Sequence, residues 1–370
     1  MKICKKYGFK INCIIKNNYM KKASVFLLFC FITATVISAY TAYACTRVMY
    51  KSPNNKIILT ARSMDWKDDI YPNIWVFPRG MERNGEVGKA SAKWKAKYGS
   101  VTVSAFDIAT TDGINEKGLV SNILWLEESI YPNYNPNGKE KGMSLAIWAQ
   151  YVLDNYATVA ETVVDLKKNP VVVVTANTPG RASLATVHLA VSDASGDSAI
   201  FEYIDGKLVI YHSSNYNVLT NSPTFDKQLA VNNYISFLPG NESLPGSGRS
   251  EDRFARASYY AKAVEQSDDQ KIATGAAFSI IRNCSVPYGV HIEGKPNLSS
   301  TKWRTVADQT NLIYYFEDPL SLTPLWVDLK TLDFKVGAPV KKLDVSKSQQ
   351  YIGLSNSLLT PHKPFVFMGI

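Results

Sequence analysis

A cysteine placed directly after a secretion-type leader is the feature that most restricts how this chain can be organised. Residues 23–44 form an apolar segment that follows two lysines and ends in Ala42-Tyr43-Ala44. A basic start, an apolar middle and an A-x-A end are typical of a cleaved signal peptide. Cleavage after Ala44 would make Cys45 the first residue of the mature protein. Its thiol, a nucleophile, would then share one residue with a free α-amino group, which can act as its base.

The leader also carries most of the positive charge. Residues 1–44 hold seven lysines and no acidic residue, so the formal net charge of +9 falls to +2 when these seven lysines are removed. A charge this small gives no electrostatic support for a nucleic-acid partner. The true start is either Met1 or Met20, because Met20 to Ala44 has the length of an ordinary signal peptide.

The chain after the leader has the composition of a soluble exported protein. It contains no second apolar stretch near the ~20 residues that a membrane-spanning helix needs. We therefore expect a periplasmic or secreted protein without stable membrane insertion after processing. Only Cys45 and Cys284 remain, too few for a disulfide framework. A Cys45–Cys284 bridge is an alternative, but it would silence the N-terminal thiol, so we favour a buried free thiol at Cys284.

An N-terminal cysteine can carry out acyl transfer without a histidine. A thiol has an unperturbed pKa of about 8.5, which a nearby cation lowers. An α-amino group titrates at about 7.7–8.0 and can accept a proton near neutral pH. No recognisable motif surrounds the four histidines, and we expect surface or core positions for His188, His212, His291 and His362.

Blocks of short strands separated by helices in pairs predict sheets packed on each other with helices outside. The mature chain opens with a hairpin, 46–50 and 56–62, around a turn at 53–55. Further strands are expected at 73–78, 101–108, 118–125, within 185–212 and near 304–316 and 324–329. Helices are expected at 143–154, 157–168, 225–236, 251–266 and 269–282. Residues 240–250 indicate a surface loop beside a pocket rather than a linker, so we expect one domain over residues 45–370.

Segments spread along the chain carry a family resemblance. They are Cys45-Thr46-Arg47, Ala61-Arg62-Ser63-Met64-Asp65-Trp66, the pattern D-G-I-N-E-K-G-L at 112–119, V-L-T-N-S-P-T-F-D at 218–226 and R-F-A-R at 253–256. In this order, they resemble the choloylglycine hydrolase family, which contains bile salt hydrolases and penicillin V acylases. That family belongs to the N-terminal nucleophile (Ntn) hydrolases. The resemblance implies an α+β fold, a four-layer αββα sandwich of two antiparallel sheets flanked by helices.

The resemblance also implies an amidohydrolase with no metal and no organic cofactor. Its partners would be a small N-acyl amide substrate and, as in homotetrameric relatives, further copies of the chain. Carried over by position, Cys45 is the nucleophile and its freed amine is the base. Arg62 would favour the thiolate by its charge, and Asp65 would orient the protonated amine. Arg253 would complete the charge network around the nucleophile.

Two groups are expected to hold the oxyanion. The side-chain amide of Asn221 would be one donor and the backbone N–H of Trp125 the other. Structural roles compete with these assignments, since Asn221 before Ser-Pro is also a turn former and Arg253 is also one charge on a helix face. We expect Asn115 and Gly118 to belong to a turn between strands and to be structural.

Trp125 departs from the bile salt hydrolases, which carry asparagine there, and from a penicillin acylase subgroup with tyrosine. Together with Trp66 it would form an aromatic, apolar acyl pocket, unless these indoles are core residues. The pair, like the segment 285–289, resembles the Gram-negative branch, whose penicillin V acylases also deacylate N-acyl homoserine lactones. We therefore expect an exported amidohydrolase that cleaves penicillin V, acyl homoserine lactones or both through a thioester acyl-enzyme.

Other functions stay open. Bile salt hydrolysis is the alternative within the family. A lipoprotein anchored through Cys45 is a non-enzymatic alternative, although Ala42 stands where a lipobox prefers leucine and Tyr43 where it prefers a small residue. A member that only binds acyl ligands is a third alternative, although every polar site residue except the one at position 125 is present.

Overall fold

The fold is built around the hairpin that begins at Cys45, within the residues that the computed structural model describes: 45–180, 183–237, 244–292 and 295–370. Strands β1 (Cys45–Lys51) and β2 (Ile58–Asp65) pair antiparallel over their full length, as the sequence predicts. All eight residues of β2 are buried. A strand is buried on both faces when a further layer packs on each side of its sheet, so β2 lies in the centre of the fold.

Two large sheets form the central layers. One has seven strands in the order β14-β1-β2-β17-β18-β19-β21, and the other has nine in the order β13-β12-β11-β8-β7-β6-β3-β20-β22. Their neighbouring strands are antiparallel apart from the pair β19 and β21. The remaining bounds are β3 (Asn73–Phe77), β6 (Ser100–Ala105), β7 (Ala109–Asn115), β8 (Val120–Trp125), β11 (Val187–Ser192), β12 (Ser198–Ile204), β13 (Lys207–His212), β14 (Val218–Leu219), β17 (Thr301–Asp308), β18 (Ile313–Glu317), β19 (Leu325–Asp328), β20 (Lys341–Asp344), β21 (Gly353–Leu354) and β22 (Thr360–Pro361).

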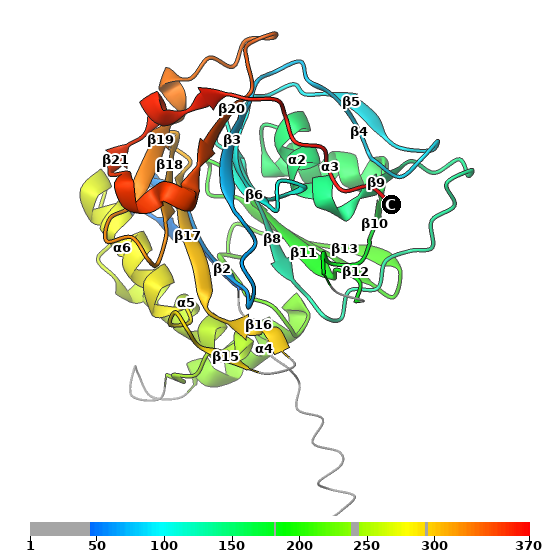
Figure 1. Cartoon of the computed structure of the whole chain (residues 1–370). Helices are drawn as coiled ribbons and strands as arrows, with labels where there is room; N and C mark the ends of the chain where they lie inside the picture. Colours follow the sequence, from blue (N-terminus) through cyan, green and yellow to red (C-terminus); the bar gives the residue numbers. More distant parts are fainter. Residues whose placement is uncertain (1–44, 181–182, 238–243, 293–294) are drawn as a thin grey trace, which may run out of the picture. The chain divides into compact units, whose positions relative to one another are not determined.

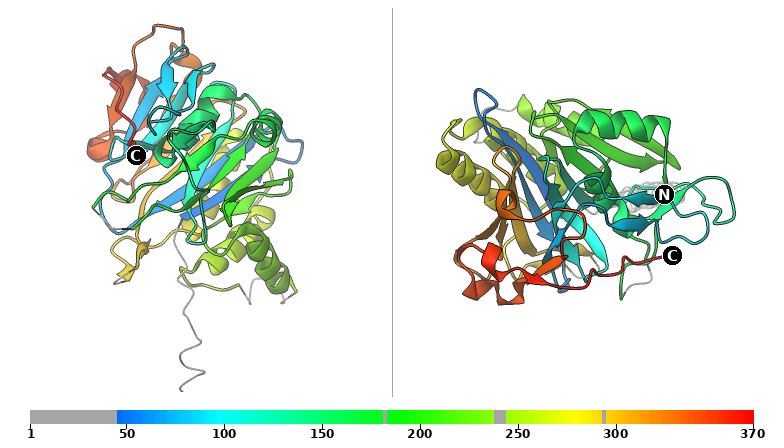
Figure 2. Two further views of the ribbon diagram at one scale, coloured as in Figure 1. Left: turned by 90° about the vertical axis from the view of Figure 1, so that its right-hand side faces the viewer. Right: turned by 90° about the horizontal axis from the view of Figure 1, so that it is seen from above.

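Helices cover the outer faces of both sheets (Figures 1 and 2). Helices α2 (Trp148–Asn155) and α3 (Val159–Lys168) pack on the nine-stranded sheet. On the seven-stranded sheet lie α5 (Ser250–Ala263) and α6 (Gln270–Asn283), with α4 (Phe225–Ser236) against α5. This helix–sheet–sheet–helix order confirms the predicted α+β sandwich. Short pairs lie outside the two sheets: β4 (Glu82–Asn84) with β5 (Lys93–Lys95), β9 (Gly142–Ser144) with β10 (Val172–Val174), and β15 (His291–Ile292) with β16 (Lys295–Ser299).

Apolar side chains fill the spaces between the layers. Trp303, Tyr314 and Phe316 belong to a cluster that includes residues of both sheets and of α5 and α6. Trp148 and Phe201 belong to a second cluster between the nine-stranded sheet and the helices α2 and α3. Complete burial of one large apolar side chain contributes about 1.5–3 kcal/mol. These clusters hold the layers at fixed positions, and the residues described below lie where the two sheets meet.

The sequence predicts most of the longer elements to within a few residues, but it misses β7 and many short strands, among them β4, β5, β10, β14 and β21. The motif at 112–119 begins inside a strand, β7, that was not predicted, and only its second half is a turn. Asn115 ends β7 and Gly118 follows at φ +81°, where a Cβ would collide with the carbonyl oxygen of Gln309. These two residues are structural, as expected. The predicted helix at 143–154 begins instead with β9 and a 3-10 turn, Leu145–Ile147, and strands β20 and β22 were not predicted.

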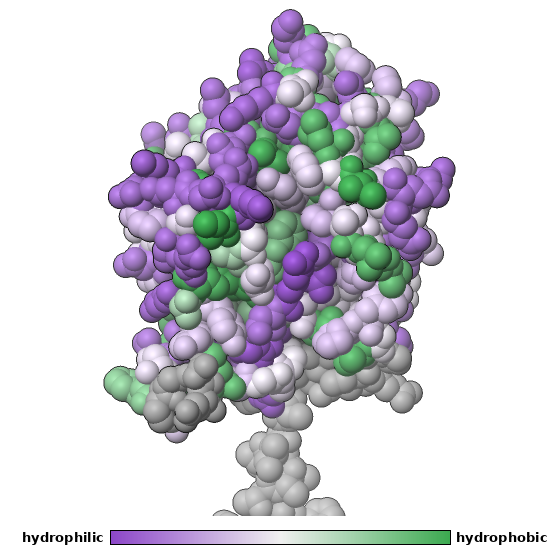
Figure 3. Space-filling model, turned by 90° about the vertical axis from the view of Figure 1, so that its left-hand side faces the viewer, coloured by the Kyte–Doolittle hydropathy of each residue, from purple (hydrophilic) through white to green (hydrophobic). Residues whose placement is uncertain are grey.

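In the part of the chain that the structure describes, no helix is both long and apolar enough to cross a membrane. Figure 3 shows one face of the molecule, on which apolar patches are separated by polar side chains. Such interspersion is usual for protein surfaces that contact water.

Candidate active site

Cys45 opens β1 opposite Met64 of β2, and its side chain is only 4% exposed. Both Cys45 and Cys284 are buried free thiols, so the alternative of a bridge between them is wrong and the expectation for Cys284 is confirmed. Burial raises the pKa of the Cys45 thiol, whereas the charges of Arg62 and Arg253 and the backbone N–H of Asp65 oppose this rise. A reactive thiolate here therefore depends on those cationic groups.

Asn221 is bonded at both ends of its side-chain amide. Its Oδ1 accepts from the backbone nitrogen of Cys45 at 2.5 Å and from Nη2 of Arg253 at 3.0 Å. Guanidinium groups only donate, so the contact with Arg253 fixes which end of the amide is the oxygen. Its Nδ2 donates to the carbonyl oxygen of Trp125 at 2.8 Å. One hydrogen of this NH2 group is thus used, and the second can serve another acceptor.

Arg253, on the first turns of α5, is fully buried against the start of β1. Its Nη1 donates to the carbonyl oxygen of Cys45 at 2.5 Å and to Oγ1 of Thr46 at 2.6 Å. Its Nε donates to the carbonyl oxygen of Gly248 at 2.9 Å. The predicted loop at 240–250, of which 240–243 lie outside the described residues, therefore supports this arginine at its far end. The described part does not line the pocket beside Cys45 that is described below.

Asp65 ends β2 and is completely buried. It accepts hydrogen bonds from Thr301 and from Oγ of Ser63, the latter at 3.3 Å. Burial raises the pKa of Asp65 to about 6, although Arg253 and Thr301 work against the rise. Ser63 Oγ also accepts from the backbone N–H of Thr46 at 3.2 Å. Asp65 is thereby linked through one hydroxyl to the residue after Cys45.

Arg62 forms a buried ion pair that the sequence analysis did not identify. Its Nη1 binds Asp112, the first residue of the motif at 112–119. Its Nη2 donates to the carbonyl oxygen of Ile123 at 2.9 Å and lies 3.3 Å from the sulfur of Met64. That sulfur lies 3.9 Å from Sγ of Cys45, so Met64 stands between the arginine and the thiol. The position of Asp112 in a patterned motif was the available signal, but its partner lies fifty residues away.

Trp125 ends β8, and its backbone faces Asn221. Leu126 donates to the carbonyl oxygen of Thr186 at 3.0 Å, while Val187, opposite Trp125, donates to Tyr131. Hydrogen-bonded and non-bonded pairs alternate in an antiparallel ladder, so Trp125 and Val187 form a non-bonded pair. The N–H and C=O of one strand residue point to the same side. The N–H of Trp125 therefore points, like its C=O, to the side on which Asn221 lies.

An apolar pocket opens beside Cys45. About 820 Å³ of space is free of protein atoms there, a volume that includes the open solvent at the mouth. The indoles of Trp66 and Trp125 both line it and are partly exposed, with ring centroids 5.5 Å apart, and Trp66 also packs against the buried core. Phe106 holds one wall at φ +54°, a conformation that bulky residues rarely adopt. The other lining residues include Arg62, Met64, Ile70, Ile108, Ile123, Leu145, Ala146, Thr178, Pro179, Val187 and Met368.

Several of these wall residues escaped the sequence analysis because they come from irregular segments. Met368 is held by hydrogen bonds from Oγ of Ser144 to its carbonyl oxygen at 2.6 Å and from its own N–H to Ile108 at 2.9 Å. Thr178 and Pro179 come from the loop before β11. No local pattern marks such residues, because their apolar contacts are made entirely in three dimensions.

No cluster of three metal-ligating side chains occurs among the described residues. His188 is buried in the core, whereas His212 and His362 are exposed at the surface. Core and surface positions are the two that were expected for the histidines. The absence of a metal and of a cofactor from the reaction stays a prediction.

The comparisons with known proteins agree with this arrangement. The sequence profile described as "Linear amide C-N hydrolases, choloylglycine hydrolase family" matches residues 45–342, starting at the cysteine itself. The chain belongs to the choloylglycine hydrolase family. It is an amide C–N hydrolase, which confirms the predicted class of enzyme.

Penicillin V acylases are similar to this family member over most of its length. One from Pectobacterium atrosepticum is 47% identical over 96% of this chain and 100% of its own. The structure of a penicillin V acylase from Agrobacterium tumefaciens matches with a TM-score of 0.81 and 53% identity, over 88% of this chain and 100% of the other. A bile salt hydrolase/transferase from Clostridium perfringens is 28% identical over 70% of this chain and 80% of its own. The protein is thus a penicillin V acylase-like amidohydrolase, and the bile salt hydrolases are distant relatives.

Proposed function

We propose that this protein is exported, loses residues 1–44 and hydrolyses N-acyl amides with Cys45 as nucleophile. The leader pattern and the start of the family match at Cys45 support this processing. The contact of the Cys45 nitrogen with Asn221 supports it further, because a freed α-amine at this position keeps the same acceptor. The observation that carries the proposal is the opening of the apolar pocket at the Cys45 thiol.

The reaction begins when the α-amine takes the thiol proton and the sulfur attacks the amide carbonyl carbon. A C–S bond forms, and the carbonyl π electrons move to oxygen. Nδ2 of Asn221 and the N–H of Trp125 donate to this oxyanion. As the tetrahedral intermediate collapses, the C–N bond breaks and the α-ammonium returns its proton to the leaving amine. Water then attacks the thioester, which releases the carboxylic acid and restores the thiol.

The charged residues around Cys45 receive distinct roles. Arg62 and Arg253 stabilise the thiolate against the effect of burial. Arg253 also holds the backbone of Cys45 and the Oδ1 of Asn221. Asp65 carries the negative charge that favours the protonated α-amine and orients it.

The pocket favours an acyl group without polar substituents. Two indoles and aliphatic side chains form its walls, and a steroid nucleus with hydroxyl groups would leave those hydroxyls without partners there. We therefore propose penicillin V, with its phenoxyacetyl group, and N-acyl homoserine lactones, with fatty acyl chains, as substrates. Homo-oligomer formation stays part of this proposal.

Amine release from a set of substrates tests the proposal. The protein beginning at Cys45 is assayed with penicillin V, short- and long-chain acyl homoserine lactones and glycocholate. We expect turnover of the first two classes and none of glycocholate. Preferred cleavage of glycocholate would contradict the substrate assignment while leaving the mechanism intact. Turnover by Cys45→Ala would contradict the mechanism.

The mature N-terminus is tested by intact mass and N-terminal sequencing of the protein exported by a Gram-negative host. A start at an unmodified Cys45 is expected. A diacylglycerol adduct at Cys45 would instead establish a lipoprotein, whose blocked thiol and amine cannot perform the reaction.

A further inference from the structure

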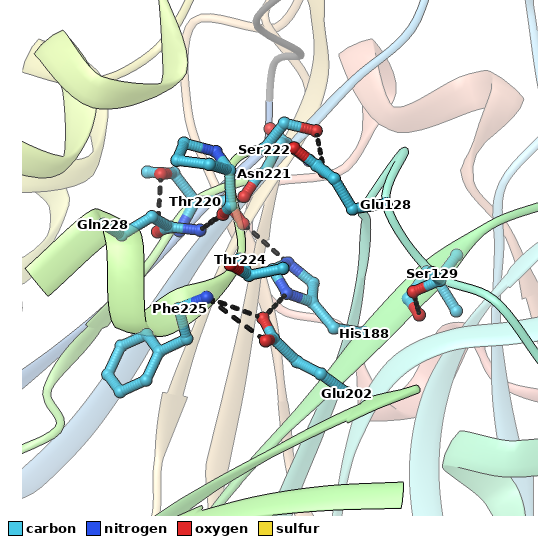
Figure 4. Close-up of polar contacts among 12 residues, drawn as sticks. Glu128, Ser129, His188, Glu202, Thr220, Asn221, Ser222, Thr224, Phe225 and Gln228 are labelled. Atoms are coloured by element: carbon cyan, nitrogen blue, oxygen red, sulfur yellow. Dashed lines mark hydrogen bonds and ion pairs between the residues drawn. The ribbon is translucent and has the colours of Figure 1, made fainter. Parts of the chain in front are cut away.

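A pair of buried titratable side chains, His188 of β11 and Glu202 of β12, lies behind Asn221 and has no part in the reaction above (Figure 4). Both side chains are fully buried. Nδ1 of His188 lies 2.9 Å from Oε1 of Glu202, and Nε2 of His188 lies 2.8 Å from the carbonyl oxygen of Thr220. Thr220 immediately precedes Asn221, so the imidazole contacts the peptide unit that carries the proposed oxyanion donor.

The chemistry of the neighbours fixes one hydrogen of this pair. A carbonyl oxygen only accepts, so Nε2 of His188 carries a hydrogen and donates it to Thr220. Glu202 also accepts from the backbone N–H of Phe225, the first residue of α4, at 3.0 and 3.2 Å. Its carboxylate therefore caps a helix N-terminus, where negative charge is favoured. Glu202 thus holds the imidazole on one side and the start of α4 on the other.

This contact joins the two sheets at the point where the proposed oxyanion donors meet. Asn221 follows β14 of the seven-stranded sheet, whereas Trp125 ends β8 of the nine-stranded sheet. His188 lies on β11, the strand next to β8, and pairs with Leu124, the residue before Trp125. A hydrogen bond from His188 to Thr220 therefore fixes the Asn221 backbone relative to the strand of its partner donor.

The backbone of Asn221 is also held from the helix side. Oγ of Ser250 on α5 accepts from the N–H of Asn221 at 2.9 Å, and Gln228 on α4 donates to its carbonyl oxygen. These contacts fix the residue relative to α4 and α5. The Asn221 side chain reaches the nine-stranded sheet through Nδ2 and the carbonyl oxygen of Trp125 at 2.8 Å. His188 adds a contact from the same sheet to the backbone next to Asn221.

We propose that His188, held by Glu202, is a positioning residue that sets Asn221 against Trp125 for oxyanion binding. This inference rests on the proposed function. An oxyanion hole acts on the transition state, so its misplacement lowers kcat and leaves KM nearly unchanged. A displacement near 1 Å costs on the order of 100-fold in rate.

Two variants separate positioning from simple packing. His188→Phe keeps a ring of similar size but deletes both hydrogen bonds. Glu202→Gln keeps them, because its amide oxygen can accept from Phe225 while its NH2 donates to Nδ1, which leaves the hydrogen on Nε2. We expect His188→Phe to lower kcat for penicillin V by about 10- to 100-fold with KM changed by less than about threefold. Glu202→Gln should stay within about threefold of wild-type kcat.

The rate at which iodoacetamide alkylates Cys45 distinguishes a positioning role of His188 from a merely structural one. Alkylation needs the thiolate but forms no oxyanion, so His188→Phe should react at the wild-type rate while its kcat falls. His212→Phe is the matched control, because His212 pairs with Asp197 at 2.7 Å on the far side of β12 and belongs to no part of this network. It should keep wild-type kcat.

Each result of these experiments either supports or contradicts the positioning role of His188. If His188→Phe keeps wild-type kcat, or loses kcat and alkylation in parallel, the positioning role is wrong. If that variant does not fold, Glu202→Ala provides the test, because it frees the imidazole without altering the ring, and an unchanged kcat there also overturns the inference. Wild-type protein without turnover of any amide would instead overturn the proposed function, and this inference with it.

Discussion

The backbone nitrogen of Cys45 lies 2.5 Å from Oδ1 of Asn221, although the two residues are far apart in the sequence. The amide of Asn221 thereby holds the first atom of the proposed mature chain with its oxygen and faces Trp125 with its nitrogen. One side chain thus locates both the proposed base and a proposed donor to the oxyanion. This arrangement leads to predictions for each end of the amide.

At the oxygen end, a single extra residue before Cys45 should remove the base. A chain that begins at Ala44 has a peptide nitrogen at Cys45, which cannot accept a proton. We expect its kcat/KM for penicillin V to be about 10²–10⁴ lower than that of the chain beginning at Cys45, the usual value of a general base. Steady-state kinetics on both forms, with their masses verified, checks this. Equal activity of the two would show that the amine is not the base.

At the nitrogen end, Asn221→Ala should lower kcat by about 10²–10³, which is the loss seen when one oxyanion donor is removed. Asn221→Asp should lose at least as much, because a carboxylate repels the oxyanion. Single-turnover kinetics separates the acylation step, where this loss must occur. A variant with a raised KM and normal acylation would assign Asn221 to substrate binding.

The buried pair of Arg62 and Asp112 should be important for folding as well as for the thiol. Asp112→Ala leaves the arginine charge buried without its partner, which costs about 3–5 kcal/mol of unfolding free energy. Asp112→Asn keeps a hydrogen-bond acceptor and should cost less. Arg249→Ala, which breaks an exposed pair with Glu251, is the control and should cost under about 1 kcal/mol. Urea denaturation of the three variants checks the order.

The pKa of Asp65 predicts how stability depends on pH. Burial places its folded pKa at about 6, above the value of about 3.9 in an unfolded chain. The native state therefore binds the proton of Asp65 more tightly than the unfolded chain does. The stability that protonated Asp65 contributes is complete below about pH 4 and is lost as the pH rises through 6. For the form beginning at Ala44, we compare the free energy of unfolding of Asp65→Asn with that of wild type. The difference should shift in favour of the variant by about 3 kcal/mol between pH 4 and pH 8.

Urea denaturation at both pH values measures this gain. The form beginning at Cys45 should show a smaller gain, because its α-ammonium favours the ionised carboxylate of Asp65. Equal gains in the two forms would contradict the proposed contact between Asp65 and the amine.

The indole of Trp125 should determine which acyl groups are accepted. Trp125→Ala enlarges the pocket and removes the ring contact with Trp66. We expect kcat/KM for penicillin V to fall by about 10- to 100-fold, mainly through KM, since loss of one buried side chain costs about 1.5–3 kcal/mol. Cleavage of glycocholate should fall less or rise. Kinetics on both substrates checks the ratio, and an unchanged ratio would remove Trp125 from substrate selection.

The sequence predicts the layers of this fold because β1, β2 and α6 carry strong local patterns. It also places Asn221, Arg253 and Asp65, since each lies in a motif recognisable along the chain. It does not predict the partnership of Arg62 with Asp112 or of His188 with Glu202. Arg62 and Asp112 lie on strands of different sheets, which no local pattern connects. His188 and Glu202 lie on the consecutive antiparallel strands β11 and β12, where a local pattern can indicate that the strands pair but not what the two side chains contact.

Some residues that line the pocket also could not be predicted from the sequence. Phe106 and Met368 line it from irregular segments, and an apolar residue in such a segment has no periodicity that would mark it. Trp66 was predicted because it directly follows Asp65, and Trp125 because the family resemblance assigns its position to the site.

Part of the pocket wall thus comes from segments other than the strands that carry the proposed reactive groups. Cys45 and Asp65 lie on central strands that are buried at every position except Lys51, so substitutions near them are constrained by the core. Met368, Thr178 and Leu145 reach the same cavity from loops and a short turn, which tolerate change far better. Because loop substitutions can reshape the pocket without changing these strands, descendants of this enzyme can acquire new acyl preferences while the chemistry at the cysteine is inherited unaltered.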